Sequence, residues 1–207
     1  MINYKILADA IEYYKGMNYI ETNIPWYVKD TIHNITFETN KSKWQLPSGD
    51  ILLGSAEQGF INQMLNHNLV GKFQATTPCF REDTIDELHQ EYFIKTELFI
   101  NESEDFNKTL HEMVNDVFNF LTKHVDVTRI NFVDTSSETG IRSIDIEIDG
   151  IEIGSYGIRE YKYGDKIYTW VYGTGIALPR FSKVLVWKLI MYISTIFGIC
   201  AGMNLMI

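Results

Sequence analysis

The chain has 207 residues and a net charge of −9, and 45% of its residues are hydrophobic against 22% that are charged. These values are typical of a folded globular protein and exclude a mainly disordered or collagen-like chain. Two cysteines, Cys79 and Cys200, are too few for a disulfide framework or a four-cysteine zinc site, so we expect free thiols in a cytoplasmic protein.

The acidic balance of the chain restricts its partners. There are 27 Asp and Glu residues against 18 Lys and Arg residues, whereas general nucleic-acid binders neutralise phosphates with basic side chains. We therefore expect no DNA partner, although one local basic site could still hold a nucleotide. Residues 1–10 contain no long apolar run, so we expect no signal peptide.

The first half of the chain alternates between helical and strand-like patterns. The spacing of apolar residues predicts a helix, a strand, two short strand-like stretches around a turn, a helix, and two strands joined by a polar loop. Gly16 ends the first helix and Pro25 closes the first strand. In chain order these elements cover residues 2–15, 19–24, 32–53 with the turn at 47–50, 56–67, 73–81 and 91–100.

The second half predicts one more helix and a run of strands. A continuous apolar stripe over residues 106–121 is typical of a helix that packs against a core. From residue 129 onward apolar and polar residues alternate, which predicts strands joined by short turns and hence an antiparallel sheet. The strands cover residues 144–148, 151–158 and 167–172, the last ending at Gly173. We expect a single α+β domain over residues 1–207, with an antiparallel β-sheet flanked by helices.

The last 30 or so residues are predicted to be helical, and their end is strongly apolar. Residues 189–207 carry no charge, and the length of this segment is near the minimum for a membrane span. Within it, Gly198 and Gly202 have GxxxG spacing. A buried C-terminal helix is the other interpretation, because polar residues such as Tyr192 and Asn204 dilute the run. We favour the buried helix and expect no membrane anchor.

The first candidate cluster surrounds the polar loop between two predicted strands. Arg81 and Asp83 lie in the run Phe80-Arg81-Glu82-Asp83 after one strand, and Phe93 lies on the next. An Arg can bind a phosphate bidentately, and an aromatic ring offers a stacking face for a base. A solvated charge cluster on a turn explains the same run without a ligand.

The second cluster is a pair of carboxylates. Asp145 and Glu152 lie seven residues apart on either side of a turn at Gly150. Two carboxylates near a strand junction can hold Mg²⁺ while phosphates and waters complete its coordination. Acidic residues that face solvent on an edge strand are the alternative, because alternation is the commonest strand pattern.

Glycines and arginines recur in the two remaining clusters. In Gly154-Ser155-Tyr156-Gly157-Ile158-Arg159 the glycines permit close approach of a ligand, and the guanidinium suits an anionic substrate group. In Gly173-Thr174-Gly175 a GxG run is followed five residues later by Arg180, at the start of the final helical stretch.

Taken in order, these clusters resemble the three motifs of class II aminoacyl-tRNA synthetase catalytic cores. Residues 16–25 (GMNYIETNIP) resemble motif 1, residues 80–93 resemble motif 2 and residues 173–181 resemble motif 3. The tripeptide Ser55-Ala56-Glu57 is similar to the family's loop between motifs 1 and 2. The resemblance covers nearly the whole chain and implies the class II fold.

The stretch from Asp145 to Arg159 is similar to the aspartate and asparagine branch of the family, which includes asparagine synthetase A. This resemblance implies that Asp145 and Glu152 hold Mg²⁺ at the ATP phosphates, and that Arg159 grips the side-chain carboxylate of an acidic amino acid. Other branches stay open, because the motif 2 run also resembles the phenylalanyl enzyme and the phosphoseryl enzyme has a similar EIxxxGI stretch.

The family resemblance implies a reaction in which an amino-acid carboxylate attacks the α-phosphate of ATP and pyrophosphate leaves. It assigns catalysis to Arg81, on the α-phosphate, and to Arg180, on the γ-phosphate. Glu57 receives the substrate ammonium, and Phe93 stacks on adenine with Arg180 covering the other face. The further implied contacts are with ATP for Asp83, Gly173 and Gly175, and with the amino acid for Gly154, Tyr156, Gly157 and Arg159.

Departures from the family pattern keep a second function open. Asp83 replaces the usual Glu of motif 2, and Pro179 replaces the usual acidic residue before Arg180. We expect a homodimeric ligase that uses ATP and Mg²⁺ to activate an amino acid for ammonia, an RNA such as tRNA, or a protein. The alternative is a non-catalytic paralogue that binds a nucleotide or an amino acid and regulates a partner.

Overall fold

The computed structural model describes residues 2–37, 43–82, 90–136 and 142–185. The helices are α1 (Tyr4–Gly16), α2 (Asp30–His33), α3 (Ala56–His67) and α4 (Phe106–Leu121), with a short 3₁₀ helix at Val127–Arg129. The strands are β1 (Ile20–Glu21), β2 (Tyr27–Val28), β3 (Ile51–Leu52), β4 (Lys72–Phe80), β5 (Tyr92–Ile100), β6 (Ile130–Asp134), β7 (Ser143–Ile148), β8 (Ile151–Tyr163) and β9 (Lys166–Leu178).

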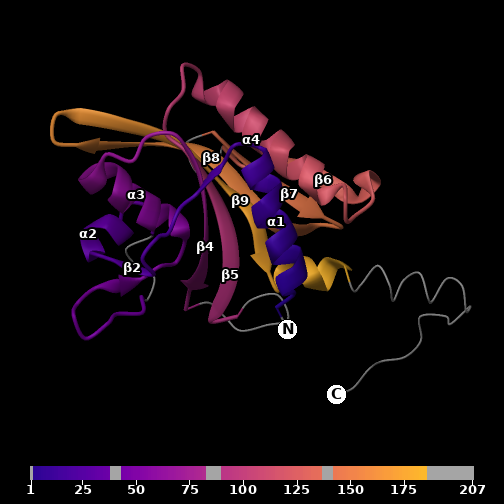
Figure 1. Ribbon diagram of the computed structural model, residues 1–207, viewed down its shortest axis with the longest axis horizontal. Helices are drawn as coiled ribbons and strands as arrows, with labels where there is room; N and C mark the ends of the chain where they lie inside the picture. The colour runs from indigo at the N-terminus through magenta and orange to yellow at the C-terminus, as the bar shows by residue number, and fades with distance from the viewer. Residues whose placement is uncertain (1, 38–42, 83–89, 137–141, 186–207) are drawn as a thin grey trace, which may run out of the picture.

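A seven-stranded sheet with the order β1-β4-β5-β9-β8-β7-β6 forms the centre of the described chain (Figure 1). All neighbouring strands in it are antiparallel except β1 and β4, which are parallel. The predicted α+β class with an antiparallel sheet flanked by helices is confirmed, with this one parallel pair at the edge. A parallel pair needs a long crossover connection. Here the chain between β1 and β4 contains α2, α3 and the small β2–β3 sheet.

The predicted elements agree with the structure except in four places. The strand expected over 151–158 continues to Tyr163 as β8. The strand expected over 19–24 is shorter in the structure, where β1 covers Ile20–Glu21. The first strand-like stretch expected within 32–53 starts at residues 32 and 33, which belong instead to the end of α2. The second stretch is present, because Gln45 bridges Ile51 across the turn at 47–50. The strand expected to end at Gly173 continues to Leu178, the last residue of β9.

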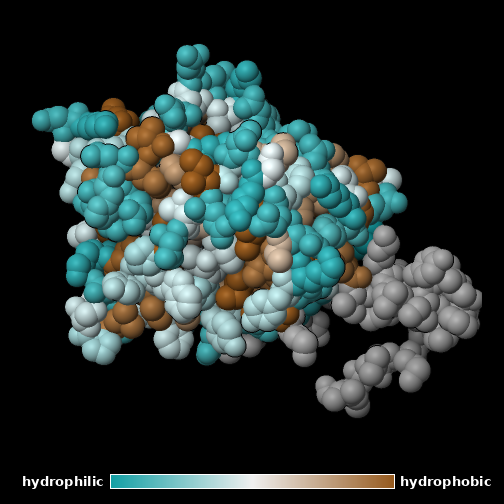
Figure 2. Space-filling view, viewed as in Figure 1, coloured by the Kyte–Doolittle hydropathy of each residue, from teal (hydrophilic) through white to brown (hydrophobic). Residues whose placement is uncertain are grey.

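Adjacent residues of the central strands pack into two different cores, one on each face of the sheet. Leu98 belongs to the core that α1 and α4 cover, whereas Phe99 belongs to the core that α2 and α3 cover. In Figure 1 α3 and the α1–α4 pair accordingly lie on different sides of the sheet. The outer surface in this view is mostly hydrophilic, with smaller groups of hydrophobic residues between (Figure 2).

Hydrogen bonds from side chains and a left-handed residue define the ends of helices α3 and α4. The Asp105 carboxylate accepts hydrogen bonds from the backbone of Asn107 and Lys108 at the start of α4, and the Ser55 hydroxyl accepts one from Glu57 at the start of α3. Helix α3 then ends where Asn68 takes a left-handed conformation. These caps fix where α3 begins, and therefore where Glu57 lies.

Cys79 is a free thiol, as predicted, and it is buried. Burial raises the pKa of this group to about 12. Cys200 and the apolar segment 189–207 lie outside the described residues, so both interpretations of that segment stay predictions. Within the described ranges, no helix combines the length and the apolar character that a membrane crossing requires.

Gly173 leaves space for an aromatic ring. A methyl group at this position would lie 2.4 Å from Cδ1 of Tyr156 and 2.7 Å from Sδ of Met113. We expect Gly173→Ala to lower the free energy of unfolding by about 1–3 kcal/mol in a urea titration, because the added methyl overpacks a core of fixed shape. Gly16→Ala is the control with little effect, since nothing lies within 4 Å of that position.

The double variant Gly173→Ala/Tyr156→Val tests the cause of this loss. Removing the ring makes room for the methyl, so the glycine substitution should destabilise the Tyr156→Val background much less than the native one. An equal loss in both backgrounds would show that the ring is not what requires the glycine.

Candidate functional site

One face of the sheet carries most of the predicted site residues. Directly paired residues of neighbouring strands point to the same face. Asp145 of β7 pairs with Ser155 of β8, and Arg159, four residues further along β8, pairs with Trp170 of β9. These side chains therefore share the face that α3 covers in part, where Trp170 belongs to the second core.

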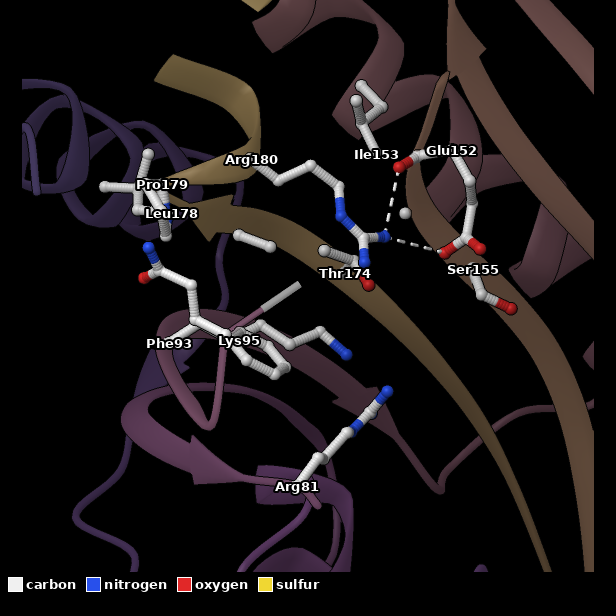
Figure 3. A pocket seen from close by; sticks show the side chains of 13 residues that line it. Arg81, Phe93, Lys95, Glu152, Ile153, Ser155, Thr174, Leu178, Pro179 and Arg180 are labelled. Atoms are coloured by element: carbon white, nitrogen blue, oxygen red, sulfur yellow. Dashed lines mark hydrogen bonds and ion pairs between the residues drawn. The ribbon is translucent and has the colours of Figure 1, made fainter. Parts of the chain in front are cut away.

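An open pocket lies on this face where β5, β8 and β9 meet (Figure 3). Figure 3 shows the side chains of Arg81, Lys95 and Arg180 directed into it from different elements. The pocket is lined by Arg81, Gln90, Phe93, Lys95, Glu152, Ile153, Gly154, Ser155, Thr174, Ala177, Leu178, Pro179 and Arg180. Five predicted site residues from four separate clusters thus come together: Arg81, Phe93, Glu152, Gly154 and Arg180.

Arg81 and Phe93 form one wall of the pocket. Arg81 follows β4, and its guanidinium carbon lies 5.4 Å from the centre of the Phe93 ring. Its Nε donates a hydrogen bond of 3.0 Å to the carbonyl of Gly54, which fixes the arginine beside the loop before α3. The guanidinium lies over the aromatic ring, and a cation and a ring of this kind can bind the phosphate and the base of a nucleotide.

Arg180 and Glu152 form the opposite wall. Arg180 begins the helical stretch at 180–185 that follows β9, as the sequence predicts. Its Nη1 donates a hydrogen bond of 3.1 Å to the carbonyl of Glu152. The same nitrogen lies 3.5 Å from Oε1 of the Glu152 carboxylate (Figure 3). The structure therefore pairs the residue predicted for the γ-phosphate with a residue predicted to hold Mg²⁺.

The two predicted metal ligands lie on neighbouring strands. Asp145 is on β7 and Glu152 is on β8, and a β-bulge between Ile146 and Glu147 separates the two pairings. No group of three or more His, Cys, Asp and Glu residues suited to a metal is present among the described residues. Two carboxylates fit Mg²⁺ only if phosphate oxygens and waters supply the other ligands, so the fit depends on a phosphate-bearing substrate.

Glu57 and Arg159 meet at the other end of this face. Nε of Arg159 lies 3.1 Å from Oε1 of Glu57, in an ion pair that lacks hydrogen-bond alignment. Nε1 of Trp170 donates a hydrogen bond of 2.8 Å to the same oxygen. The guanidinium carbon of Arg159 lies 4.6 Å from the centre of the Tyr172 ring.

Burial dominates the titration of this cluster. The Glu57 side chain is only 5% exposed, and burial raises the pKa of its carboxyl group, whereas Arg159 opposes that shift. Burial, with the Glu57 charge as a smaller cause, raises the pKa of Tyr172 to about 12. Glu57, predicted to receive an ammonium, and Arg159, predicted to grip a carboxylate, therefore neutralise each other in this structure.

The sequence motifs missed Lys95 and Glu97. The Glu97 side chain is 3% exposed, and its carboxylate accepts hydrogen bonds from the Ser55 hydroxyl at 2.5 Å and from the Ala56 backbone. Nζ of Lys95 lies 2.7 Å from Oε1 of Glu97. Alternation along β5 could have found both residues, because positions 93, 95 and 97 share one face.

Tyr156, which was predicted to bind the substrate, lies on the opposite face of the sheet. It is 1% exposed in the core with α4, and its hydroxyl donates a 2.7 Å hydrogen bond to the carbonyl of Thr174. Its ring occupies the space that a Cβ would take at Gly154 and Gly173. We therefore leave Tyr156 and Gly173 out of the proposed site, while Gly154 stays in the pocket wall.

The other two predicted glycines also accommodate tyrosine rings. A Cβ at Gly157 would lie 2.7 Å from the hydroxyl oxygen of Tyr172, and one at Gly175 would lie 2.8 Å from Cε2 of Tyr14. The Tyr14 hydroxyl donates a 2.8 Å hydrogen bond to the carbonyl of Gly175. These contacts explain the glycines by packing, and their ligand roles stay predictions. Asp83, predicted to bind ATP, lies outside the described residues.

Comparison with solved structures identifies the architecture. The chain is similar to a pyrrolysyl-tRNA synthetase, PylSc, from Desulfitobacterium hafniense, with a TM-score of 0.67 and 13% identity over 85% of this chain and 66% of that one. It is also similar to a cytoplasmic serine-tRNA ligase from Naegleria fowleri, solved with AMP, with a TM-score of 0.67 and 15% identity over 87% of this chain and 52% of that one. The fold is that of a class II aminoacyl-tRNA synthetase catalytic core.

The structural likeness defines the fold of the class II core and no more, because the sequence identities are low. No family model matches the sequence, and no curated protein matches it. The chain spans 66% and 52% of the lengths of the two solved proteins.

The Glu57–Arg159 pair gives a test of the site's energetics. We expect Arg159→Met to lower the free energy of unfolding by roughly 3 kcal/mol, because it leaves a buried carboxylate without its cation. The double variant Glu57→Gln/Arg159→Met should recover part of that loss in a urea titration, since Trp170 can still donate to the remaining amide oxygen. Losses that simply add would show that the two groups do not interact.

Proposed function

We propose that this class II core activates an amino acid with ATP as an aminoacyl adenylate. The observation that carries the proposal is the pocket in which an aromatic ring and three cations converge, on the sheet face whose other end holds the buried carboxylate of Glu57. The ring and cations, Phe93 with Arg81, Lys95 and Arg180, suit a nucleotide phosphate. The Naegleria ligase was solved with AMP, which supports a nucleotide as the ligand of this pocket.

In the proposed reaction, a carboxylate oxygen of the amino acid bonds to the α-phosphorus of ATP. The bond from that phosphorus to the bridging oxygen breaks, and pyrophosphate leaves with the electron pair. No proton moves in this step, so the protein acts mainly by neutralising charge on the crowded phosphorus. We assign the α-phosphate to Arg81 and the γ-phosphate to Arg180, with adenine stacked on Phe93.

Mg²⁺ belongs to the proposal through Asp145 and Glu152, which would hold it against the ATP phosphates. Bound there, the ion would neutralise phosphate charge and orient the leaving pyrophosphate. Arg180 contacts the Glu152 carboxylate, so the residue proposed for the γ-phosphate and a residue proposed for Mg²⁺ lie side by side at the pocket wall.

An acidic amino acid fits the buried pair best. An ammonium group can pair with Glu57 while a side-chain carboxylate pairs with Arg159, so the substrate replaces one internal ion pair by two. A substrate with an apolar side chain would separate Glu57 from Arg159 and leave the guanidinium without an anion, which is costly in a mostly buried site. The acceptor of the activated acyl group, whether ammonia, an RNA or a protein, is not defined by these contacts.

We also propose a homodimer that forms through motif 1. Ile20 of the edge strand β1 is 60% exposed, and the nearby Trp26 and Tyr27 are 57% and 49% exposed. A short edge strand with exposed apolar side chains suits an isologous contact between two copies. Sedimentation analysis of the full chain at several concentrations would measure this association.

Amino-acid-dependent exchange of radiolabelled pyrophosphate into ATP tests the activity. With Mg²⁺ and the twenty amino acids added singly, we expect exchange with an acidic amino acid and a loss of at least about 10²-fold in Arg81→Ala, which removes charge stabilisation at the phosphate. Arg142→Ala is the matched control, because that arginine contacts His111 and does not line the pocket. Exchange that persists in Arg81→Ala would refute the motif 2 assignment.

The substrate class is tested by Arg159→Ala in the same assay. We expect this variant to lose the preference for an acidic amino acid while it keeps ATP binding. An equal loss for every amino acid would overturn the assignment of Arg159. A wild-type chain that binds ATP but exchanges with no amino acid would favour the alternative, a nucleotide-binding paralogue without catalysis.

A further inference from the structure

Lys95 lines the pocket, yet none of the sequence motifs includes it. Its side chain is only 12% exposed, and a buried ammonium is unfavourable unless it meets an anion. The register of β5 places Lys95 between Thr77 of β4 and Ala177 of β9. The ammonium thus extends from the middle of three neighbouring strands, and the outer two are followed by Arg81 and Arg180.

The carboxylate of Glu97, which contacts Lys95, has hydrogen-bond donors besides this lysine. Nζ lies 2.7 Å from Oε1 of Glu97, but that carboxylate also accepts hydrogen bonds from Ser55 and from the backbone N–H of Ala56 at the start of α3. A lysine has three N–H donors, so the contact with Glu97 leaves donors for a second anion. Figure 3 shows the end of Lys95 directed into the pocket between the ends of Arg81 and Arg180.

The position of Lys95 along the site points to one part of the ligand. Phe93, two residues earlier on the same face, belongs to the nucleotide end of the pocket. Glu97, two residues later, contacts the loop that carries Glu57 at the amino-acid end. Lys95 therefore lies at the junction of the two ends, where the α-phosphate of a nucleotide would meet the carboxylate of an amino acid.

We propose that Lys95 is a phosphate-binding residue that contacts the α-phosphate of the bound nucleotide, together with Arg81. This inference rests on the proposed function, because it needs a nucleotide in the pocket with its base against Phe93. The contact is a charge-assisted hydrogen bond from a largely desolvated ammonium to a non-bridging oxygen, and such bonds are about twice as strong as neutral ones.

Isothermal titration of the full chain with AMP and with adenosine tests the contact, because the two ligands differ only in the phosphate. We expect the wild-type chain to bind AMP more tightly than adenosine. Lys95→Met should weaken AMP binding by about 10- to 100-fold, the loss of one charged hydrogen bond, with adenosine binding unchanged. Lys95→Arg should keep most of the preference for AMP, since it keeps the charge.

Two further variants separate the outcomes. Phe93→Ala should weaken both ligands alike, and Lys108→Met, at an exposed position on α4, should change neither. If Lys95→Met keeps the full preference for AMP, or loses both ligands equally, the inference is wrong while the proposed function stands. If the wild-type chain binds neither ligand, the nucleotide site itself fails and the proposed function falls with it. Should Lys95→Met not fold, Lys95→Gln provides the same comparison.

Discussion

The carboxylate of Glu97 connects the two ends of the site. It is buried on β5 and accepts hydrogen bonds from Ser55 and Ala56 at the start of α3, where the helix dipole favours a negative charge. This contact holds the loop before α3 against the sheet, and so it places Glu57 beside Arg159. On the same strand Lys95 extends from Glu97 into the pocket. The geometry of both ends therefore depends on one buried anion that no sequence motif marks.

The charges of this face contrast with those of the whole protein. The chain carries a net charge of −9, yet Arg81, Lys95 and Arg180 converge on a pocket lined by the single carboxylate of Glu152 among its described residues. An acidic net charge combined with a small basic pocket disfavours extended nucleic-acid backbones and permits a compact phosphate ligand. The electrostatic constraint thus agrees with a nucleotide substrate better than with a polyanion bound along the surface.

The sequence predicted the fold well because its strongest signals are periodic. The α4 stripe and the alternation along β7 and β8 each follow from local spacing. It could not predict that β1 pairs in parallel with β4, because that pairing depends on a long crossover. It could not tell a ligand-binding glycine from one that makes room for a ring either: Gly173 faces Tyr156 only because β8 and β9 pair in one register.

The same limit applies to the charged residues of the site. Glu57 and Arg159 are far apart in the sequence, and nothing local indicates that they form a mostly buried pair. Once paired, each stabilises the other's charge. If the proposed function holds, a substrate that separates them has to supply both an ammonium and an acidic group, and selectivity would arise from the free energy of leaving a buried charge unpaired. Under that proposal, stability and recognition would depend on the same two side chains.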